Sequence, residues 1–126
     1  KVLREGQKIA LVATGMMVQE ALKAADILSK EGILVTVVDM PCIKPIDEEL
    51  IEEIAKSHEI IITCEEHNVY GGLGSAVSEV TSKKSPVRME MMGMQDTFGE
   101  SGTPNELLAK YGLNADHIVE KVKECL

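Results

Sequence analysis

A segment of mixed chemistry occupies the middle of the chain, from Glu65 to Ser75. It begins with two carboxylates and a histidine and continues into a turn rich in glycine. A histidine beside a carboxylate can act as a general acid and base pair. Free N–H groups at the start of a helix can hold a phosphate or another small anion. We predict a small-anion site, or an interface loop, formed by Glu66, His67, Gly71, Gly72 and Gly74.

A structural interpretation of the same segment competes with the anion site. Its glycines match neither the G-x-G-x-x-G fingerprint nor the P-loop. The two glutamates could themselves occupy the positive end of the helix dipole. The segment would then be a tight strand-to-helix turn, in which glycines supply a positive φ or a close approach to a neighbour. In that case, replacing Gly72 with Val would destabilise the fold.

The residues of this segment give little support for nucleophilic catalysis or for metal binding. No recognisable motif places a Ser or Cys nucleophile beside His67. Cys64 lies in a strand pattern and is expected to be buried and inert. Glu65, Glu66 and His67 are too close in sequence to ligate one metal ion, because successive residues of an extended chain point to alternate faces. We therefore expect no metal ligands in this chain, and these residues taken alone do not make an active site.

The composition excludes several classes of function. With 126 residues, 44% of them hydrophobic and 27% charged, the chain suits one globular domain over residues 1–126. A net charge of −8 argues against a nucleic-acid partner, and the longest apolar runs are too short to cross a membrane. The three cysteines, an odd number without framework spacing, predict free thiols in a reducing compartment, the cytoplasm.

The elements that must position these side chains alternate between strand and helix patterns. Three continuous apolar runs predict buried strands, and an alternating run predicts an edge strand. These runs occupy residues 8–13, 33–38, 60–63 and 87–91. Helical spacing predicts a helix between each pair of strands, the first with Glu20 on a polar face and the second capped by Asp47. Two short helices follow, one from a capping box at residues 103–106 and one capped by Asn114.

This order of elements predicts an α/β fold. The pattern β-α-β-α-β-α-β-α-α implies parallel strands joined by right-handed crossovers, with helices on both faces of the sheet. Ligands of such sheets bind at the carboxyl ends of the strands. The segment from Glu65 to Ser75 lies at one of those ends.

The motifs of the chain, taken in order, resemble the C-terminal domain of transketolase and its relatives. They are Ala13-Thr14-Gly15, Val38–Pro41, Ile43–Asp47, Glu65-Glu66-His67, Gly71–Val77, Asp96–Gly102 and Leu107–Leu113. Residues 98–102 followed by Tyr111-Gly112-Leu113 are most similar to transketolase, particularly the separate C-terminal subunits of split transketolases. The turn at residues 44–47 and Glu65-Glu66-His67 are also similar to deoxyxylulose-phosphate synthase and to the β-subunits of 2-oxo acid dehydrogenases.

The resemblance implies a three-layer α/β/α domain with a mostly parallel five-stranded sheet. It adds an N-terminal strand near Val2–Arg4, antiparallel to the rest, which the residue patterns do not reveal. It also implies part of a pentose phosphate pathway transferase that moves two-carbon ketol units between sugar phosphates with thiamine diphosphate and Mg²⁺. In the family, the preceding domains, or an N-terminal subunit, bind both cofactors. This domain would then be inactive alone, pack beside the pyrimidine-binding domain and support a homodimer.

Two other hypotheses remain open from the sequence. The glycine-rich turn before a helix is compatible with a stand-alone module that binds a small anion. The acidic surface with few aromatic residues is compatible with a module that serves only oligomerisation.

Overall fold

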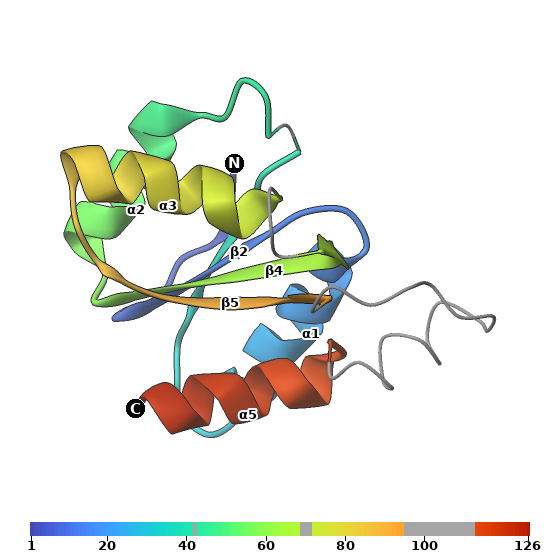
Figure 1. The fold of residues 1–126 in the computed structure, drawn as a ribbon. Coiled ribbons are helices and arrows are strands. Elements are labelled where there is room, and N and C mark those ends of the chain that lie inside the picture. The colour runs from blue at the N-terminus through green and yellow to red at the C-terminus, as the bar shows by residue number, and fades with distance from the viewer. Residues whose placement is uncertain (42, 69–71, 95–112) are drawn as a thin grey trace, which may run out of the picture.

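The structure is a computed structural model that describes residues 1–41, 43–68, 72–94 and 113–126 (Figure 1). Along the chain the elements are β1 (Val2–Arg4), β2 (Ile9–Ala13), α1 (Met17–Ser29), β3 (Thr36–Asp39), α2 (Glu48–Ser57), β4 (Ile60–Asn68), α3 (Leu73–Lys84), β5 (Arg88–Met94) and α5 (Ala115–Cys125). The predicted alternation of strands and helices is confirmed up to β5. The helix predicted from the capping box at residues 103–106 lies outside the described residues.

The five described strands form one mixed sheet in the order β1-β3-β2-β4-β5. Strands β2 to β5 run parallel, whereas β1 pairs antiparallel with β3. This confirms the α/β prediction and also the antiparallel N-terminal strand that the family resemblance implied. The alternating run at residues 87–91 was predicted to be an edge strand. This is confirmed by β5, which ends the described sheet beside β4.

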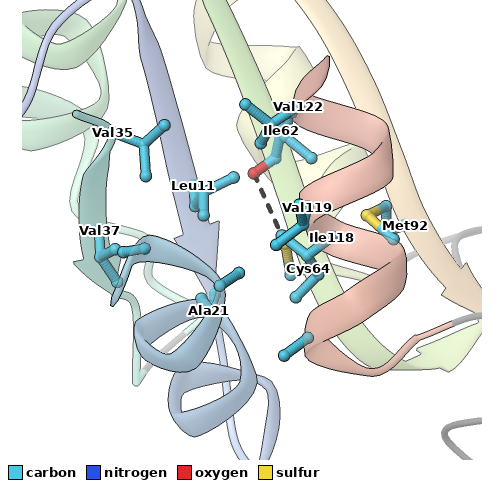
Figure 2. Packing of buried hydrophobic residues seen from close by; sticks show 14 of the residues in the cluster. Leu11, Ala21, Val35, Val37, Ile62, Cys64, Met92, Ile118, Val119 and Val122 are labelled. Atoms are coloured by element: carbon cyan, nitrogen blue, oxygen red, sulfur yellow. Dashed lines mark hydrogen bonds between the residues drawn. The ribbon is translucent and has the colours of Figure 1, made fainter. Parts of the chain in front are cut away.

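Helices cover both faces of the sheet and produce two separate cores (Figure 1). Helices α1 and α5 pack on one face, where Leu11, Ile62 and Ile118 are fully buried. Figure 2 shows the side chains of α5 in this core together with Cys64 of β4 and Met92 of β5. Helices α2 and α3 cover the opposite face. Every residue of β2 is buried, as its continuous apolar run predicts for a central strand.

Two helices begin at the predicted capping residues. The carboxylate of Asp47 accepts the N–H of Leu50 at 3.1 Å, and the side-chain oxygen of Asn114 accepts the N–H of His117 at 3.2 Å. Each bond satisfies one of the backbone donors that a helix start leaves without an intrahelical partner. Local sequence therefore determines where α2 and α5 begin.

A strained turn leads into β2. Lys8 has a positive φ of 62°, and the N–H of Ile9 donates to the carbonyl of Gln7 at 2.6 Å. A hydrogen bond from the N–H of residue i+2 to the carbonyl of residue i, with a positive φ at the residue between them, is typical of the rare and strained form of the γ-turn. The carbonyl of Lys8 accepts the N–H groups of Glu59 at 2.7 Å and Ile60 at 3.1 Å, which hold the turn in place.

Candidate functional site

The predicted segment begins inside a strand rather than in a loop. The apolar run at residues 60–63 predicts only part of β4, which continues to Asn68. Residues Glu65 and Glu66 therefore alternate across the sheet. Glu65 points toward α3, to which it is hydrogen-bonded, whereas Glu66 lies on the side of the turn before α1. The backbone of His67 continues β4, and its predicted acid–base role beside Glu66 stays a prediction.

Glu65 is a fully buried carboxylate at the start of α3. Its Oε1 accepts the N–H of Leu73 at 2.9 Å, and its Oε2 accepts the N–H of Gly74 at 2.9 Å. The N-cap residue, Gly72, provides no capping side chain. A negative charge is favourable at a helix N-terminus because the helix dipole is positive there. Glu65 therefore supplies the capping group of α3 from the neighbouring strand.

This contact favours the structural interpretation of the helix start. Two of the N–H groups that an anion site at α3 would use are engaged by Glu65. Of the two glutamates expected at the positive end of the helix dipole, Glu65 is found there, whereas Glu66 lies beside Gly15. The interface role proposed for the same loop is a separate prediction and stays one.

The glycines of the segment act differently from one another. A Cβ atom on Gly74 would lie 2.7 Å from Sδ of Met91 and 3.1 Å from Oγ1 of Thr63, so the expected close approach to a neighbour is confirmed there. Gly72 has a φ of −98°, so the positive φ considered for it is absent. Gly71 lies outside the described residues. The left-handed conformation occurs instead at Gly15, with a φ of 60°.

The side chain of Glu66 lies beside the turn that precedes α1, the helix on the other face of the sheet. Its Oε1 lies 2.5 Å from the position that a Cβ atom on Gly15 would take. The turn at Gly15 leads into α1, since the N–H of Val18 donates to the Gly15 carbonyl at 3.2 Å. Consecutive glutamates of β4 thus lie beside the starts of two helices on opposite faces of the sheet.

A second buried carboxylate was not predicted. Glu20, expected on a polar face of α1, is only 9% exposed. Its Oε1 accepts the N–H of Ala115, the first residue of α5, at 3.0 Å, and its Oε2 pairs with Nζ of Lys23 at 3.1 Å. The expectation is wrong because Glu20 faces α5, which helical periodicity within α1 alone does not indicate. An acidic residue next to apolar Met17 and Ala21 was the available signal.

His58 has a structural role at the end of α2. Its Nε2 lies 2.7 Å from Oγ1 of Thr36, and its Nδ1 lies 2.9 Å from the carbonyl of Ile54. The Thr36 hydroxyl also accepts the N–H of Gly6 at 2.9 Å. These contacts tie the C-terminus of α2 to β3 and to the turn after β1. Both ring nitrogens are thereby engaged in holding elements together.

The described thiols are poor nucleophiles. Burial, assisted by the negative charge of Glu65, raises the pKa of the Cys64 thiol to about 12. Burial also raises the pKa of Cys125. Since the thiolate is the reactive form, both groups stay protonated near neutral pH. The prediction that Cys64 is buried is confirmed, and its raised pKa supports the prediction that it is inert. Both thiols are free, as predicted from the cysteine count.

Two cavities of the described part of the chain are lined by residues other than Glu65. One of about 210 Å³ is lined by Lys8, Leu34 and Leu126 among others, at the amino ends of the strands. Another, of about 180 Å³, separates residues 43–48 from α3. The described residues contain no group of three His, Cys, Asp or Glu side chains that could hold a metal ion. None of the described helices combines the length and the apolar character needed to cross a membrane.

The chain matches the model of one domain family and is similar to known proteins of two kinds. Residues 1–118 match the model of the transketolase C-terminal domain. The 1-deoxy-D-xylulose-5-phosphate synthase of Desulforudis audaxviator is 46% identical over 94% of this chain and 19% of that protein. A 6-deoxy-6-sulfo-D-fructose transketolase subunit from a Clostridium species is 41% identical over 97% of this chain and 38% of the subunit.

A solved structure has the same fold as this chain. A split-gene transketolase, described as an inactive beta4 tetramer, superposes with a TM-score of 0.92 and 49% identity, over 98% of this chain and 41% of that chain. The chain thus spans less than half the length of each of these relatives.

Proposed function

The chain belongs to the transketolase C-terminal domain family, and from this premise we propose that it serves a transketolase. It is the C-terminal domain of a transketolase-like enzyme. The proposed reaction of the whole enzyme is transfer of a two-carbon ketol unit between sugar phosphates. The observation that carries this proposal is the 49% identity and the TM-score of 0.92 to a split-gene transketolase.

A second candidate has its own support. The synthase of D. audaxviator is 46% identical to this chain. The chain could therefore serve a deoxyxylulose-phosphate synthase instead of a transketolase. Both candidates give this domain the same role, because in each case it would be the C-terminal part of a larger thiamine enzyme.

We assign the domain a supporting role rather than a catalytic one. Glu65 and Glu20 use their carboxylates to cap α3 and α5, and His58 bridges α2 and β3. The Cys64 thiol is buried and protonated. These groups do not fit a site for thiamine diphosphate and Mg²⁺, since their polar atoms are already engaged with the backbone or buried. We propose that the preceding domains, or an N-terminal subunit, bind both cofactors.

The partners and location of the enzyme follow from the same proposal. The domain would pack beside the pyrimidine-binding domain and help to assemble a homodimer in the cytoplasm. The tetrameric assembly of the split-gene relative supports association of such subunits. The free thiols of Cys64 and Cys125 are compatible with a reducing compartment.

The decisive experiment reconstitutes the enzyme from its parts. Ketol transfer from a ketose phosphate to an aldose phosphate is measured with this chain alone, with the preceding domains alone and with both, in the presence of thiamine diphosphate and Mg²⁺. We expect no turnover by this chain alone and turnover by the combination. Turnover by this chain alone would refute the supporting role. In a parallel assay with pyruvate and an aldose phosphate, deoxyxylulose-phosphate formation with release of CO₂, in the absence of ketol transfer, would favour the second candidate.

A further inference from the structure

We propose that the cavity of about 210 Å³ at the amino ends of the strands binds a small apolar carboxylate, whose charge pairs with Lys8 and whose apolar part lies between Leu34 and Leu126. We call it the amino-end cavity. The proposal concerns the domain itself and does not depend on which reaction the whole enzyme catalyses. It rests on the conformation of Lys8, on the charges around its side chain and on the apolar walls of the cavity.

Lys8 has a backbone conformation that its residue type does not favour. Among the described residues other than glycine, it alone has a positive φ, of 62°. Glycine adopts this φ without strain, and Asn or Asp adopts it more readily than other residues do. Strained conformations of this kind cluster at active sites and at sites that hold ligands. Since the backbone gives no reason for a lysine here, we assign the role of Lys8 to its side chain.

The Lys8 side chain has no acidic partner within the described part of the chain. It is exposed, and none of the ion pairs between described residues includes it. Glu59, whose N–H donates to the Lys8 carbonyl at 2.7 Å, lines a neighbouring cavity of about 230 Å³ and not this one. Glu31, next to the lining residue Gly32, is paired with Nζ of Lys123 at 2.8 Å. The Lys8 ammonium is therefore available to an external anion.

The other walls of the amino-end cavity are mostly apolar. They include Ile33, Leu34 and Val35 of the segment before β3, and Leu126 after α5. Leu34 is 49% exposed and Leu126 is 60% exposed, so both leave apolar surface open to a ligand. A cavity of about 150 Å³ is enough to hold benzene. The amino-end cavity therefore suits a ligand whose apolar part is about as large as a benzene ring.

The amino-end cavity is formed entirely by described residues. None of its lining residues adjoins residues 42, 69–71 or 95–112 in the chain. Figure 1 shows the amino ends of β4 and β5 on the same side of the domain as the C-terminus. The net charge of −8 repels anions at long range, but physiological salt screens exposed charges beyond about 8 Å. The single ammonium at the cavity therefore determines the charge preference, and it matches one negative charge.

The test titrates the 126-residue chain with phenylacetate and with its neutral analogue, phenylacetamide. Amide-detected NMR spectra at constant ionic strength follow binding residue by residue. For a probe of about ten heavy atoms we expect a Kd of roughly 1 mM for phenylacetate, with saturable shifts at residues 7–9 and 32–35. Phenylacetamide should bind at the same residues roughly tenfold more weakly, because a hydrogen bond to a charged group is the stronger one.

Substitutions separate the charge of Lys8 from the fold. Lys8→Gly removes the ammonium and relieves the strain, so it should fold at least as stably as the wild type yet bind phenylacetate roughly tenfold more weakly. Lys8→Arg keeps the charge and should keep the preference for phenylacetate over phenylacetamide. Leu34→Gln, on the apolar wall, should weaken binding of both probes. Lys83→Gln removes an exposed positive charge on α3 and, as the matched control, should bind both like the wild type.

Three results would overturn the proposal. The first is the lack of saturable shifts at residues 7–9 and 32–35 at tens of millimolar phenylacetate. The second is equal affinity of the wild-type chain for phenylacetate and phenylacetamide, a comparison that needs no variant and so holds even if a change at Lys8 prevents folding. The third is a Lys8→Gly variant that is folded and binds phenylacetate as tightly as the wild type.

Discussion

Replacing Glu65 tests the contact on which the structure of the candidate site depends. In Glu65→Ala, the N–H groups of Leu73 and Gly74 lose their acceptors while they remain buried. A hydrogen bond to a charged group contributes about 1.5–3 kcal/mol, and a buried donor left without a partner costs a similar amount. Because truncation also leaves a cavity, we expect a loss of about 4 kcal/mol in the free energy of unfolding.

The Glu65→Gln variant separates charge from shape. Glutamine fills the same space and keeps one acceptor oxygen, but it sets an NH₂ group against the second N–H donor. The expected loss is about 2 kcal/mol, between wild type and the Ala variant. The free energy of unfolding is measured by urea denaturation followed by circular dichroism. Glu79→Gln, an exposed change on the same helix, serves as the control and should alter stability by less than about 0.5 kcal/mol.

Added formate gives an independent check of the Ala variant. A small carboxylate can enter the space left by the side chain and accept the same N–H groups. Stability of Glu65→Ala should therefore rise with formate concentration, by comparison with chloride at equal ionic strength, while the wild type responds equally to both salts. If Glu65→Gln is as stable as the wild type, the charge and the second bond do not stabilise α3, and if Glu65→Ala is as stable as the wild type the whole reasoning is refuted.

Three further predictions concern other parts of the fold. Gly74→Val should lower the free energy of unfolding by about 1–3 kcal/mol in urea denaturation, because a Cβ there meets Sδ of Met91 at 2.7 Å; unchanged stability would mean that Met91 moves away without cost. Lys8→Gly should raise the denaturation midpoint and add roughly 0.5–1.5 kcal/mol, since glycine adopts the φ of 62° without strain; a lower midpoint would contradict this. Iodoacetamide at pH 8, with mass spectrometry, should label Cys125 before Cys64, whose pKa of about 12 leaves about one molecule in ten thousand as thiolate. The raised pKa of Cys64 also means that its contribution to stability is complete below pH 9 and is lost as pH rises from 9 toward 12, as urea denaturation at alkaline pH would show.

The sequence predicted the sheet and its layers well because strong periodic signals carried them. Apolar runs located β2 and β4, and the capping residues Asp47 and Asn114 marked two helix starts that the structure confirms. β1 escaped prediction from the residues because three residues with mixed polarity carry no period, and it pairs with a strand more than thirty positions away in the chain. Such a strand is determined by its tertiary partner rather than by its own sequence.

The candidate site was only partly predictable, since it depends on contacts between elements. A glutamate at the end of a strand was recognised as a possible cap, and Glu65 takes that position. The sequence did not indicate which of Glu65 and Glu66 would do so, because this is decided by the face of β4 that α3 covers. Glu20 was misplaced for a related reason, as its partner Ala115 lies 95 residues away. A positive φ was one of two reasons considered for Gly72, which has a φ of −98°, whereas Gly15 has a φ of 60°.

The hydrogen bond between the Glu20 carboxylate and the Ala115 N–H also has a consequence for folding during synthesis of the protein. A ribosome releases α1 before α5, so the carboxylate of Glu20 and the apolar side chains around it lack their partner helix until α5 has emerged. A growing chain with an open apolar surface is prone to aggregate. This domain is therefore expected to depend most on chaperone protection in the interval between the emergence of α1 and that of α5.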